Sequence, residues 1–325
     1  MKFIKKIVLI IFIVAFIAFL GSAFYYNYWR SKNTKHTFRF LNNTAKLDYT
    51  TMYWKDGNIG EISVKKTALF VKVHLNGNAQ DYFMQLDTGT PSTVFYGKVL
   101  AQLKKELVFN TFYAKDSTPF VKNMELQIAN SKFSADRIKI LQQMGITKID
   151  TSFIVIGTLG FDSFVDRTLV LDFKKDRLAI TNKSLKAINY PIKLVKNASV
   201  SKFPVLIPAK INGEKVRFFY DSGSSMFSVL TSNKNLAKLQ PNDKIDTLCC
   251  VQNWDKQFKV FRKKLRNKIE IENLKEETEF IYSIDKMNIV NYFPNWFMYG
   301  ITGNTLFNDK LIIIDTKNNL FGISN

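Results

Sequence analysis

The sequence is poor in the residues on which most metal sites and nucleophilic active sites depend. Its 325 residues include only two histidines, His36 and His74, and only two cysteines. Two histidines leave no room for a conventional zinc site, and a Ser-His-Asp triad would have to rest on one of them. The cysteines, Cys249 and Cys250, are adjacent, so normal disulfide geometry is hard for them to reach. We expect no metal and no cofactor. We favour small apolar filling as the role of both cysteines, and a reactive role is the alternative.

Proline, glycine and acidic residues are also few. Seven Pro and 14 Gly, with 46% hydrophobic and 23% charged residues, match a globular protein and argue against disorder or collagen-like repeats. At roughly 100–200 residues per domain, the length predicts two core-forming units. Only 27 acidic residues oppose 47 Lys and Arg, which leaves a net charge of +20.

This positive charge does not indicate a nucleic-acid partner. The densest basic run, Lys256–Lys268, has Phe258 and Phe261 interleaved. No zinc finger, RNP-type aromatic motif or basic-zipper heptad accompanies it, as nucleic-acid recognition would normally require. We therefore expect no nucleic acid, and infer a weak attraction to anionic membrane surfaces.

One long hydrophobic run, Ile7–Trp29, follows three lysines near the N-terminus. About 20 apolar residues span a bilayer core, and the aromatic residues that end this run suit the membrane interface. We predict a signal anchor and stalk over residues 1–36, and a single-pass protein at the cell membrane with its C-terminal domain outside the cytoplasm. Cleavage near Gly21-Ser22-Ala23, which would give a secreted or periplasmic protein, is the alternative.

The rest of the chain is typical of a mainly β protein. Short apolar or alternating runs, bounded by turn signals such as Asn76-Gly77 and Asn212-Gly213, predict strands. These strands are Ala68–Leu75, Tyr82–Leu86, Thr168–Leu171, Val216–Tyr220 and Leu311–Ile314. We expect a helix from Lys98 to Leu107, and short helices after Gly160 and Gly303.

An internal repeat is the most informative feature. An Asn-Gly turn, an apolar strand and the pattern Asp-[Thr/Ser]-Gly-[Thr/Ser] occur in this order twice, and the pattern reads Asp87-Thr88-Gly89-Thr90 and then Asp221-Ser222-Gly223-Ser224. A single Asp-Thr-Gly turn occurs in many β proteins, because these residues favour turns. Two copies in matched contexts indicate a duplicated fold.

A second element repeats further along the chain. Gly160 is followed twelve residues later by Asp172, at the end of an apolar strand, and Gly303 is followed by Asp315 at the same spacing. Each aspartate begins a polar hairpin. We interpret both as turn residues whose carboxylates accept hydrogen bonds from the turn backbone.

With these motifs, the sequence resembles the pepsin-like aspartic proteases, bilobal enzymes with retropepsin-like halves. The two tetrapeptides match the active-site loops of that family, and Leu159-Gly160 and Thr302-Gly303 resemble the hydrophobic-Gly elements that cradle the loops. The resemblance implies a mainly β, bilobal acid-protease fold. Its two β-barrel-like lobes would span residues 37–190 and 191–325, with a cleft between them.

The resemblance also implies roles for individual residues. Asp87 and Asp221 would be the catalytic pair. The supporting residues would be Thr88, Gly89, Thr90, Ser222, Gly223 and Ser224. In this family, the first hydroxyl residue of each loop interlocks beneath the pair, the glycine lets the backbone turn tightly, and the last hydroxyl bonds an outer carboxylate oxygen. Tyr113 and Trp254 lie where flap hairpins would be and are candidate substrate contacts.

Residue chemistry independently supports this interpretation. Two carboxylates held together cannot both ionise easily, so they share one proton and can activate a water molecule for attack on a peptide bond. This chemistry needs no metal, cofactor or nucleophilic side chain.

We therefore expect a membrane-anchored aspartic endopeptidase that acts on peptide or protein substrates. The alternative is a non-catalytic peptide- or protein-binding protein on the same fold, since a fold does not fix activity. A third class, the actin- or sugar-kinase-like ATPases, also carries Asp-x-Gly-Thr loops. It would need alternating helices and a Gly-rich adenosine loop.

Overall fold

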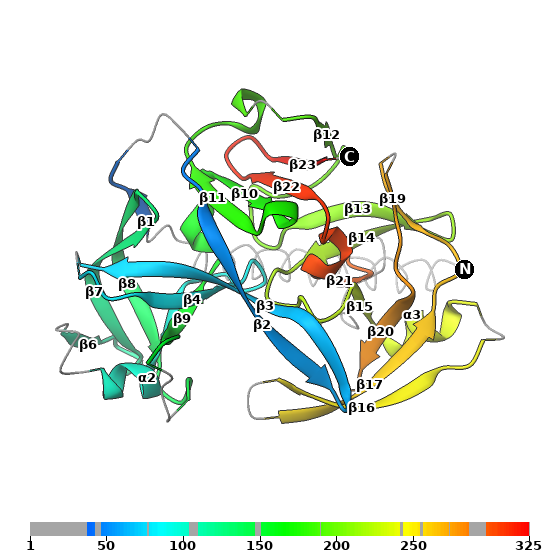
Figure 1. The fold of residues 1–325 in the computed structure, drawn as a ribbon, viewed down its shortest axis with the longest axis horizontal. Coiled ribbons are helices and arrows are strands. Elements are labelled where there is room, and N and C mark those ends of the chain that lie inside the picture. The colour runs from blue at the N-terminus through cyan, green and yellow to red at the C-terminus, as the bar shows by residue number, and fades with distance from the viewer. Residues whose placement is uncertain are drawn as a thin grey trace, which may run out of the picture. The chain divides into compact units, whose positions relative to one another are not determined.

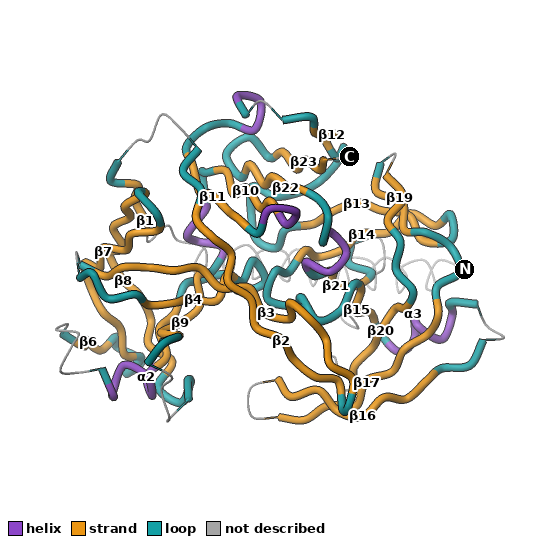
Figure 2. The backbone as a smooth tube through the Cα atoms, in the orientation of Figure 1, coloured by secondary structure: helices purple, strands orange, loops and turns teal. Residues whose placement is uncertain are grey.

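Short alternating strands separated by tight turns give this chain a mainly β structure (Figures 1 and 2). The computed structural model describes residues 38–42, 47–76, 78–103, 110–146, 151–188, 190–240, 243–253, 256–272, 274–285 and 297–324. All of them belong to one compact unit, residues 36–325. Their strands form two sheets, one of 14 strands and one of nine.

The elements up to residue 190 are called the N-terminal half, and those from residue 191 the C-terminal half. The strands of the N-terminal half are β1 (Phe38–Phe40), β2 (Thr50–Ile59), β3 (Ile62–Leu75), β4 (Tyr82–Leu86), β5 (Val94–Tyr96), β6 (Thr111–Tyr113), β7 (Pro119–Ile128), β8 (Ser131–Leu141), β9 (Val155–Leu159), β10 (Thr168–Asp172) and β11 (Arg177–Thr181). Those of the C-terminal half are β12 (Ile192–Leu194), β13 (Leu206–Ile211), β14 (Glu214–Tyr220), β15 (Val229–Thr231), β16 (Asp246–Asn253), β17 (Lys256–Lys264), β18 (Ile269–Ile271), β19 (Leu274–Glu276), β20 (Phe280–Ile284), β21 (Gly300–Thr302), β22 (Leu311–Asp315) and β23 (Leu320–Ser324). The described helices are short: α2 (Gly97–Gln102), α3 (Asn233–Lys238), and the 3-10 turns η1 (Phe161–Phe164), η2 (Phe173–Lys175), η3 (Leu185–Ala187) and η4 (Asn304–Phe307).

The five strands predicted from the sequence are confirmed as β3, β4, β10, β14 and β22. The short helices expected after Gly160 and Gly303 are the 3-10 turns η1 and η4. The helix predicted from Lys98 to Leu107 is present as α2, which ends at Gln102, where the N–H of Leu103 bonds two carbonyls of the last turn. The rest of the predicted range, residues 104–107, lies outside the described residues. The alternating long helices of an actin-like ATPase do not occur among the described residues.

The two halves repeat one strand order. In the first sheet, six neighbouring strands lie in the order β3, β4, β9, β5, β8 and β7. In the second sheet, the corresponding order is β13, β14, β21, β15, β20 and β17. In both series, the successive pairings are antiparallel, parallel, antiparallel, parallel and antiparallel. In the N-terminal half, β3 also pairs with β7, which closes these six strands into a barrel. The corresponding strands of the C-terminal half form an open sheet in the described part of the chain.

The halves meet where β10 pairs antiparallel with β22, shown green beside red in Figure 1. Val170 lies opposite Ile313 in this pairing. Each of these residues lies ten positions after the repeated glycine of its own half, so each is paired with its own counterpart. A local two-fold axis therefore passes between them. Both side chains are fully buried in one apolar cluster. The lobe boundary between residues 190 and 191 stays a prediction.

A long hairpin, β2–β3, extends from the N-terminal half to the C-terminal half (Figure 1); its outer part, residues 56–67, is called the arm. At its base, Asp176 accepts hydrogen bonds from Trp54 Nε1 at 2.9 Å and from Lys66 Nζ at 2.6 Å. Near its tip, Ile59 is buried in an apolar cluster of the C-terminal half. The tip residue Gly60 donates its N–H to the carbonyl of Cys250 at 3.1 Å. The arm is thus held at both ends.

The predicted membrane anchor, Ile7–Trp29, lies outside the described residues. Within the part that is described, no helix is both long and apolar enough to cross a bilayer.

The antiparallel pairing of β10 with β22, called the seam, should contribute strongly to stability. Ile313→Ala removes a fully buried side chain, and should lower the free energy of unfolding by about 2–5 kcal/mol through lost burial and the cavity left behind. Ile146→Ala is the matched control, because Ile146 is 59% exposed and its loss should change stability by no more than about 0.5 kcal/mol. Urea unfolding of both variants checks this, and equal losses would contradict the assigned core.

Candidate active site

The two aspartate motifs occupy equivalent places in the repeat. Asp87 directly follows β4 and Asp221 directly follows β14. The N–H of Asp87 bonds the carbonyl of Leu159 at 3.1 Å, and that of Asp221 bonds the carbonyl of Thr302 at 2.9 Å. The first loop therefore begins where β4 stops pairing with its parallel neighbour β9. The second begins where β14 stops pairing with β21.

Thr88 and Ser222 hold the two loops together, as the family resemblance implies. The hydroxyl of Thr88 accepts from the N–H of Ser222 at 2.9 Å, and the hydroxyl of Ser222 accepts from the N–H of Thr88 at the same distance. Each hydroxyl also donates across the junction, Thr88 to the carbonyl of Tyr220 at 3.0 Å and Ser222 to that of Leu86 at 2.9 Å. Both side chains are fully buried, so these four reciprocal bonds hold the loops without competition from water.

These bonds of Thr88 and Ser222, called the interlock, bring the two carboxyl groups into contact. A side-chain hydrogen bond joins Asp221 to Asp87. Burial, followed by the negative charge of Asp87 and this hydrogen bond, raises the pKa of Asp221 well above its ordinary value of 3.8. Both aspartates keep some solvent exposure. The pair can therefore hold a proton at pH values where an isolated carboxyl group has lost it, and it remains accessible.

Further hydrogen bonds orient each carboxylate. Oδ1 of Asp87 accepts from the N–H of Gly89 at 2.8 Å, and Oδ1 of Asp221 accepts from the N–H of Gly223 at the same distance. The predicted bond from Thr90 is present, with Oγ1 donating to Oδ2 of Asp87 at 2.9 Å. In the second loop, where a bond from the Ser224 hydroxyl was predicted, the backbone N–H of Ser224 donates to the carbonyl of Asp221 at 3.0 Å and also acts to lower the pKa of the Asp221 carboxyl.

The two loop glycines are required for a reason other than the predicted one. Neither Gly89 nor Gly223 has a positive φ, so the turn itself does not demand glycine. A Cβ on Gly89 would lie 2.3 Å from Cγ of Asp221, and one on Gly223 would lie 2.6 Å from Cγ of Asp87. Each glycine therefore makes room for the carboxyl group of the opposite half.

The hydrophobic-Gly elements cradle the loops as predicted. A Cβ on Gly160 would lie 2.5 Å from the backbone of Ser92, and one on Gly303 would clash with the carbonyl of Ser224. Thr302, a polar residue where the pattern expects an apolar one, is fully buried and donates its hydroxyl to the carbonyl of Ser228 at 2.7 Å. This hydrogen bond removes the cost of burying the hydroxyl.

Sequence reasoning missed a buried polar layer behind the second loop. Tyr220 Oη donates to Oδ1 of Asn304 at 2.5 Å, and Nδ2 of Asn304 donates to the carbonyl of Ser222 at 3.1 Å. Burial, and to a lesser degree the charge of Asp221, raises the pKa of Tyr220 well above 10.0, which keeps this hydroxyl a donor. A polar residue directly after the repeated glycine was the available signal.

The first loop has a different buried support. Asp162 Oδ1 accepts from the N–H of Thr93 at 2.8 Å and from its hydroxyl at 2.7 Å. The same hydroxyl accepts from the N–H of Gly160 at 3.0 Å. Both halves thus use a polar side chain of the 3-10 turn after the glycine to hold the segment around the aspartate loop, but Asp162 does so through Thr93 and Asn304 through Tyr220, Ser222 and Ser225.

The repeated aspartates Asp172 and Asp315 act in turns, as predicted. Asp172 accepts from the N–H of Lys175 at 3.2 Å, and Asp315 from the N–H of Asn318 at 2.9 Å.

Of the two candidate substrate contacts, the structure describes only Tyr113, and it does not bring this residue to the pair. Tyr113 ends β6 on a hairpin with β7, and its ring is 66% exposed and has no hydrogen bond or ring contact with the described residues of the aspartate loops. Trp254 lies outside the described residues.

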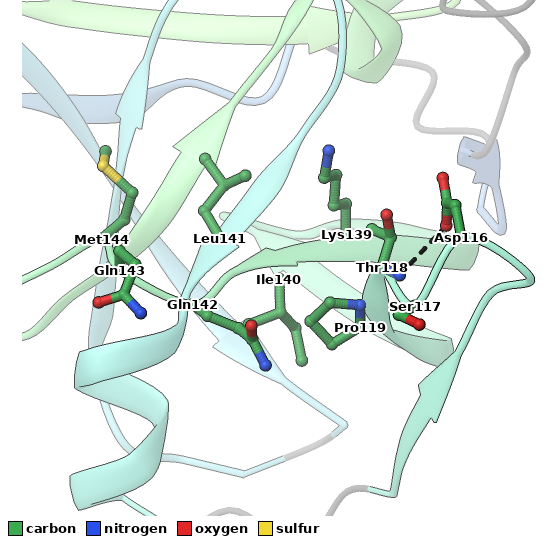
Figure 3. A pocket seen from close by; sticks show the side chains of 10 residues that line it. All are labelled: Asp116, Ser117, Thr118, Pro119, Lys139, Ile140, Leu141, Gln142, Gln143 and Met144. Atoms are coloured by element: carbon green, nitrogen blue, oxygen red, sulfur yellow. Dashed lines mark hydrogen bonds between the residues drawn. The ribbon is translucent and has the colours of Figure 1, made fainter.

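An open pocket of about 490 Å³ lies next to the β6–β7 hairpin (Figure 3). It is lined by Asp116, Ser117, Thr118, Pro119, Lys139, Ile140, Leu141, Gln142, Gln143 and Met144. None of these belongs to an aspartate loop. Its only acidic side chain, Asp116, accepts a hydrogen bond from the N–H of Thr118 at the hairpin turn, as Figure 3 shows. The pocket holds no second carboxylate that could pair with it.

No known protein-family model matches the sequence, and no curated protein matches it significantly. What the site does is therefore inferred from its residues and geometry.

The interlock should make a large contribution to stability. Thr88→Val keeps the shape of the side chain but leaves the N–H of Ser222 and the carbonyl of Tyr220 without these partners. Each unpaired buried group should cost about 1–3 kcal/mol of unfolding free energy, measured by urea titration. Thr111→Val, at an exposed strand position, should stay within about 0.5 kcal/mol of the parent. A Thr88→Val loss no larger than that would show that the interlock does not hold the loops.

The proton on the pair should make stability depend on pH. Below the unfolded-state pKa of about 3.9, the Asp221 carboxyl is protonated in both states and its contribution is fully present. As the pH rises further, the unfolded chain releases this proton first, and stability is lost until the folded pKa is passed.

The Asp221→Asn variant cannot ionise at this position, so its stability relative to the parent should grow as the pH rises above about 4, until the raised folded pKa is passed, by at most about 1.4 kcal/mol per pH unit. Chemical unfolding at several pH values measures the difference. Asp309→Asn, at a side chain that is 78% exposed, should show no such growth. A difference for Asp221→Asn that is constant or shrinks with pH would contradict a shared proton.

Proposed function

We propose that this protein is an aspartic endopeptidase with the bilobal, pepsin-like fold and retropepsin-like halves. One observation carries the proposal: two copies of one motif bring Asp87 and Asp221 into hydrogen-bonding contact through the reciprocal bonds of Thr88 and Ser222. The identical strand order around the two loops supports a duplicated fold. If the two turns had only a structural role, they would not need to hold two carboxyl groups in contact.

In the proposed reaction, the pair holds one proton between two carboxyl groups. The ionised member removes a proton from a water molecule, which attacks the carbonyl carbon of the peptide bond. The protonated member donates a hydrogen bond to the developing oxyanion, and the pair then delivers a proton to the amide nitrogen as the C–N bond breaks. The proton count of the pair is restored at the end of the cycle.

We assign the initial proton to Asp221 and the role of base to Asp87. The raised pKa of Asp221 supports the first assignment. The second is supported by donors aimed at both oxygens of Asp87, the N–H of Gly89 at Oδ1 and the hydroxyl of Thr90 at Oδ2. Since one hydrogen bond joins the two carboxyl groups, the pH dependence of hydrolysis belongs to the pair.

In this proposal the flap hairpins are β6–β7 and β16–β17, and their equivalent places in the strand order support the assignment. In the N-terminal half, β6–β7 is joined to β5 through β8, and in the C-terminal half β16–β17 is joined to β15 through β20. Tyr113 ends β6, and Trp254 lies between β16 and β17. A flap must move to admit substrate, so the exposure of Tyr113 is compatible with contact after closure.

The cellular setting remains part of the proposal. The apolar run Ile7–Trp29 would anchor the protein in the cell membrane, with the catalytic domain outside the cytoplasm and peptides or proteins as substrates. Release by signal cleavage is the alternative.

Hydrolysis should depend on both aspartates. An unbiased peptide pool incubated with the full chain should yield new termini by mass spectrometry, and pepstatin should suppress them. Asp87→Asn and Asp221→Asn should each lower the rate by a factor of at least about 10², because an amide cannot exchange the shared proton. Circular dichroism checks that both variants stay folded.

Asp309→Asn is the matched control and should cleave at the parental rate, since Asp309 is exposed and lies outside the site. Parental activity in either Asn variant of the pair would exclude the mechanism. Capture of peptides without cleavage, unchanged by those substitutions, would instead support a non-catalytic binding protein.

A further inference from the structure

The only two cysteines of the chain lie at an irregularity in β16. Leu248 pairs with Val260 and Val251 pairs with Phe258, so Cys249 and Cys250 together oppose a single residue of β17. This is a β-bulge, in which two residues of one strand face one of its neighbour. In a regular strand, adjacent side chains point to opposite faces.

The bulge has two effects on the side chains around it. Leu248 and Val251 both belong to one apolar cluster, although they are three positions apart and regular alternation would put them on opposite faces. The two sulfur atoms in between lie 3.0 Å apart and share a hydrogen bond. The sequence-based interpretation of these cysteines as apolar filling is therefore wrong for Cys249, which is exposed, while Cys250 is half-buried.

The hydrogen bond between the sulfur atoms and the nearby charges shift the pKa values of the two thiols. The hydrogen bond between the two thiols lowers the pKa of Cys249 and raises that of Cys250, and the charge of Lys259 acts to lower both. The carboxylate of Glu61, at the tip of the arm, acts in the opposite direction. An accessible sulfur with thiolate character is the attacking group in disulfide exchange.

The arm ends directly on these cysteines. The N–H of Gly60 donates to the carbonyl of Cys250 at 3.1 Å. Gly60 has a φ of +59°, and a Cβ there would lie 3.2 Å from Cβ of Cys249. The dithiol therefore forms part of the contact by which the arm of the N-terminal half rests on the C-terminal half.

We propose that Cys249 and Cys250 form a redox-active vicinal dithiol, oxidised reversibly by low-molecular-weight disulfides to an intramolecular bridge that releases the tip of the arm. This inference is independent of peptide hydrolysis and stands on the bulge, the sulfur contact and the Gly60 hydrogen bond.

The reaction is two successive thiol–disulfide exchanges. The Cys249 thiolate attacks one sulfur of the disulfide, which forms a mixed disulfide and expels one small thiolate. The Cys250 thiolate then attacks Sγ of Cys249, closes the bridge and expels the second small thiolate. The two cysteines are oxidised, the small disulfide is reduced to two thiols, and the two cysteine protons pass to the released thiolates.

Ring closure has a geometric consequence for the arm. Ordinary disulfides join Cα atoms about 4.4–6.8 Å apart, whereas a trans peptide fixes neighbouring Cα atoms about 3.8 Å apart. A bridge between neighbours is therefore strained. Shortening the 3.0 Å sulfur contact to a bond also turns ψ of Cys249 and φ of Cys250, and the latter changes the direction of the carbonyl that Gly60 uses. The same strain makes the bridge easy to reduce, which suits a reversible site.

The test uses the full chain and oxidised glutathione as the probe. After treatment, the peptide that contains both cysteines should be lighter by two hydrogen atoms and carry no glutathione, and dithiothreitol should restore it. Hydrogen exchange should show the Gly60 amide exchanging about five-fold faster in the oxidised protein, as expected for one lost hydrogen bond. The Met52 amide, which bonds the carbonyl of Asp176 at 2.8 Å at the base of the arm, should not change.

Cys249→Ser and Cys250→Ser are the matched variants, since each keeps one thiol and cannot close the ring. Both should stop at the glutathione adduct, with no change in Gly60 exchange relative to their own reduced forms. A stable adduct, two unreacted thiols or a disulfide-linked dimer in the parent would overturn the proposed bridge. A bridge that leaves Gly60 exchange unaltered would overturn its coupling to the arm.

Discussion

The reciprocal hydrogen bonds between Thr88 and Ser222 are the constraint on which the rest of the site depends. They join two points of the chain that are 134 residues apart, and each uses a buried hydroxyl as both donor and acceptor. Two carboxyl groups do not approach each other unaided, because their charges repel. The hydrogen bonds of Thr88 and Ser222 offset this repulsion, and they do so without using the carboxyl groups. The carboxyl groups themselves remain open to solvent and to protonation.

The surroundings of the pair are symmetric in backbone and asymmetric in side chains. Both loops begin at the end of a strand with a parallel neighbour, and both lie against a glycine that allows close contact. Behind them, however, the first loop uses a carboxylate, Asp162, and the second an amide, Asn304. Duplication thus fixes where the two aspartates stand, whereas later divergence of the buried support lets the two halves differ in electrostatics. A raised pKa at Asp221 is one result of burial in this setting.

Local patterns and repeats predicted much of this structure. The strands, the two 3-10 turns and the contacts of Thr88, Ser222, Asp172 and Asp315 follow from motifs whose physical roles are local or reciprocal. What the sequence could not reveal depends on pairing between distant segments. Asp56-Gly57 looks like a turn signal, yet it lies inside β2, because the arm continues to Ile59 and gains burial in the other half. The exposure of Cys249 follows from a bulge that only the register with β17 defines.

The seam between the halves has an implication for how such a chain can arise. Val170 pairs with its own counterpart, Ile313, so the contact is isologous: the same surface element serves on both sides of a two-fold axis. A polypeptide of half this length would carry a self-complementary edge and could associate through it with a second, identical copy. Joining two such copies in one chain then removes the entropy cost of association and frees each copy to change alone. The arm, the bulge and the unequal polar supports are differences of the kind that only a fused, no longer symmetric chain can accumulate.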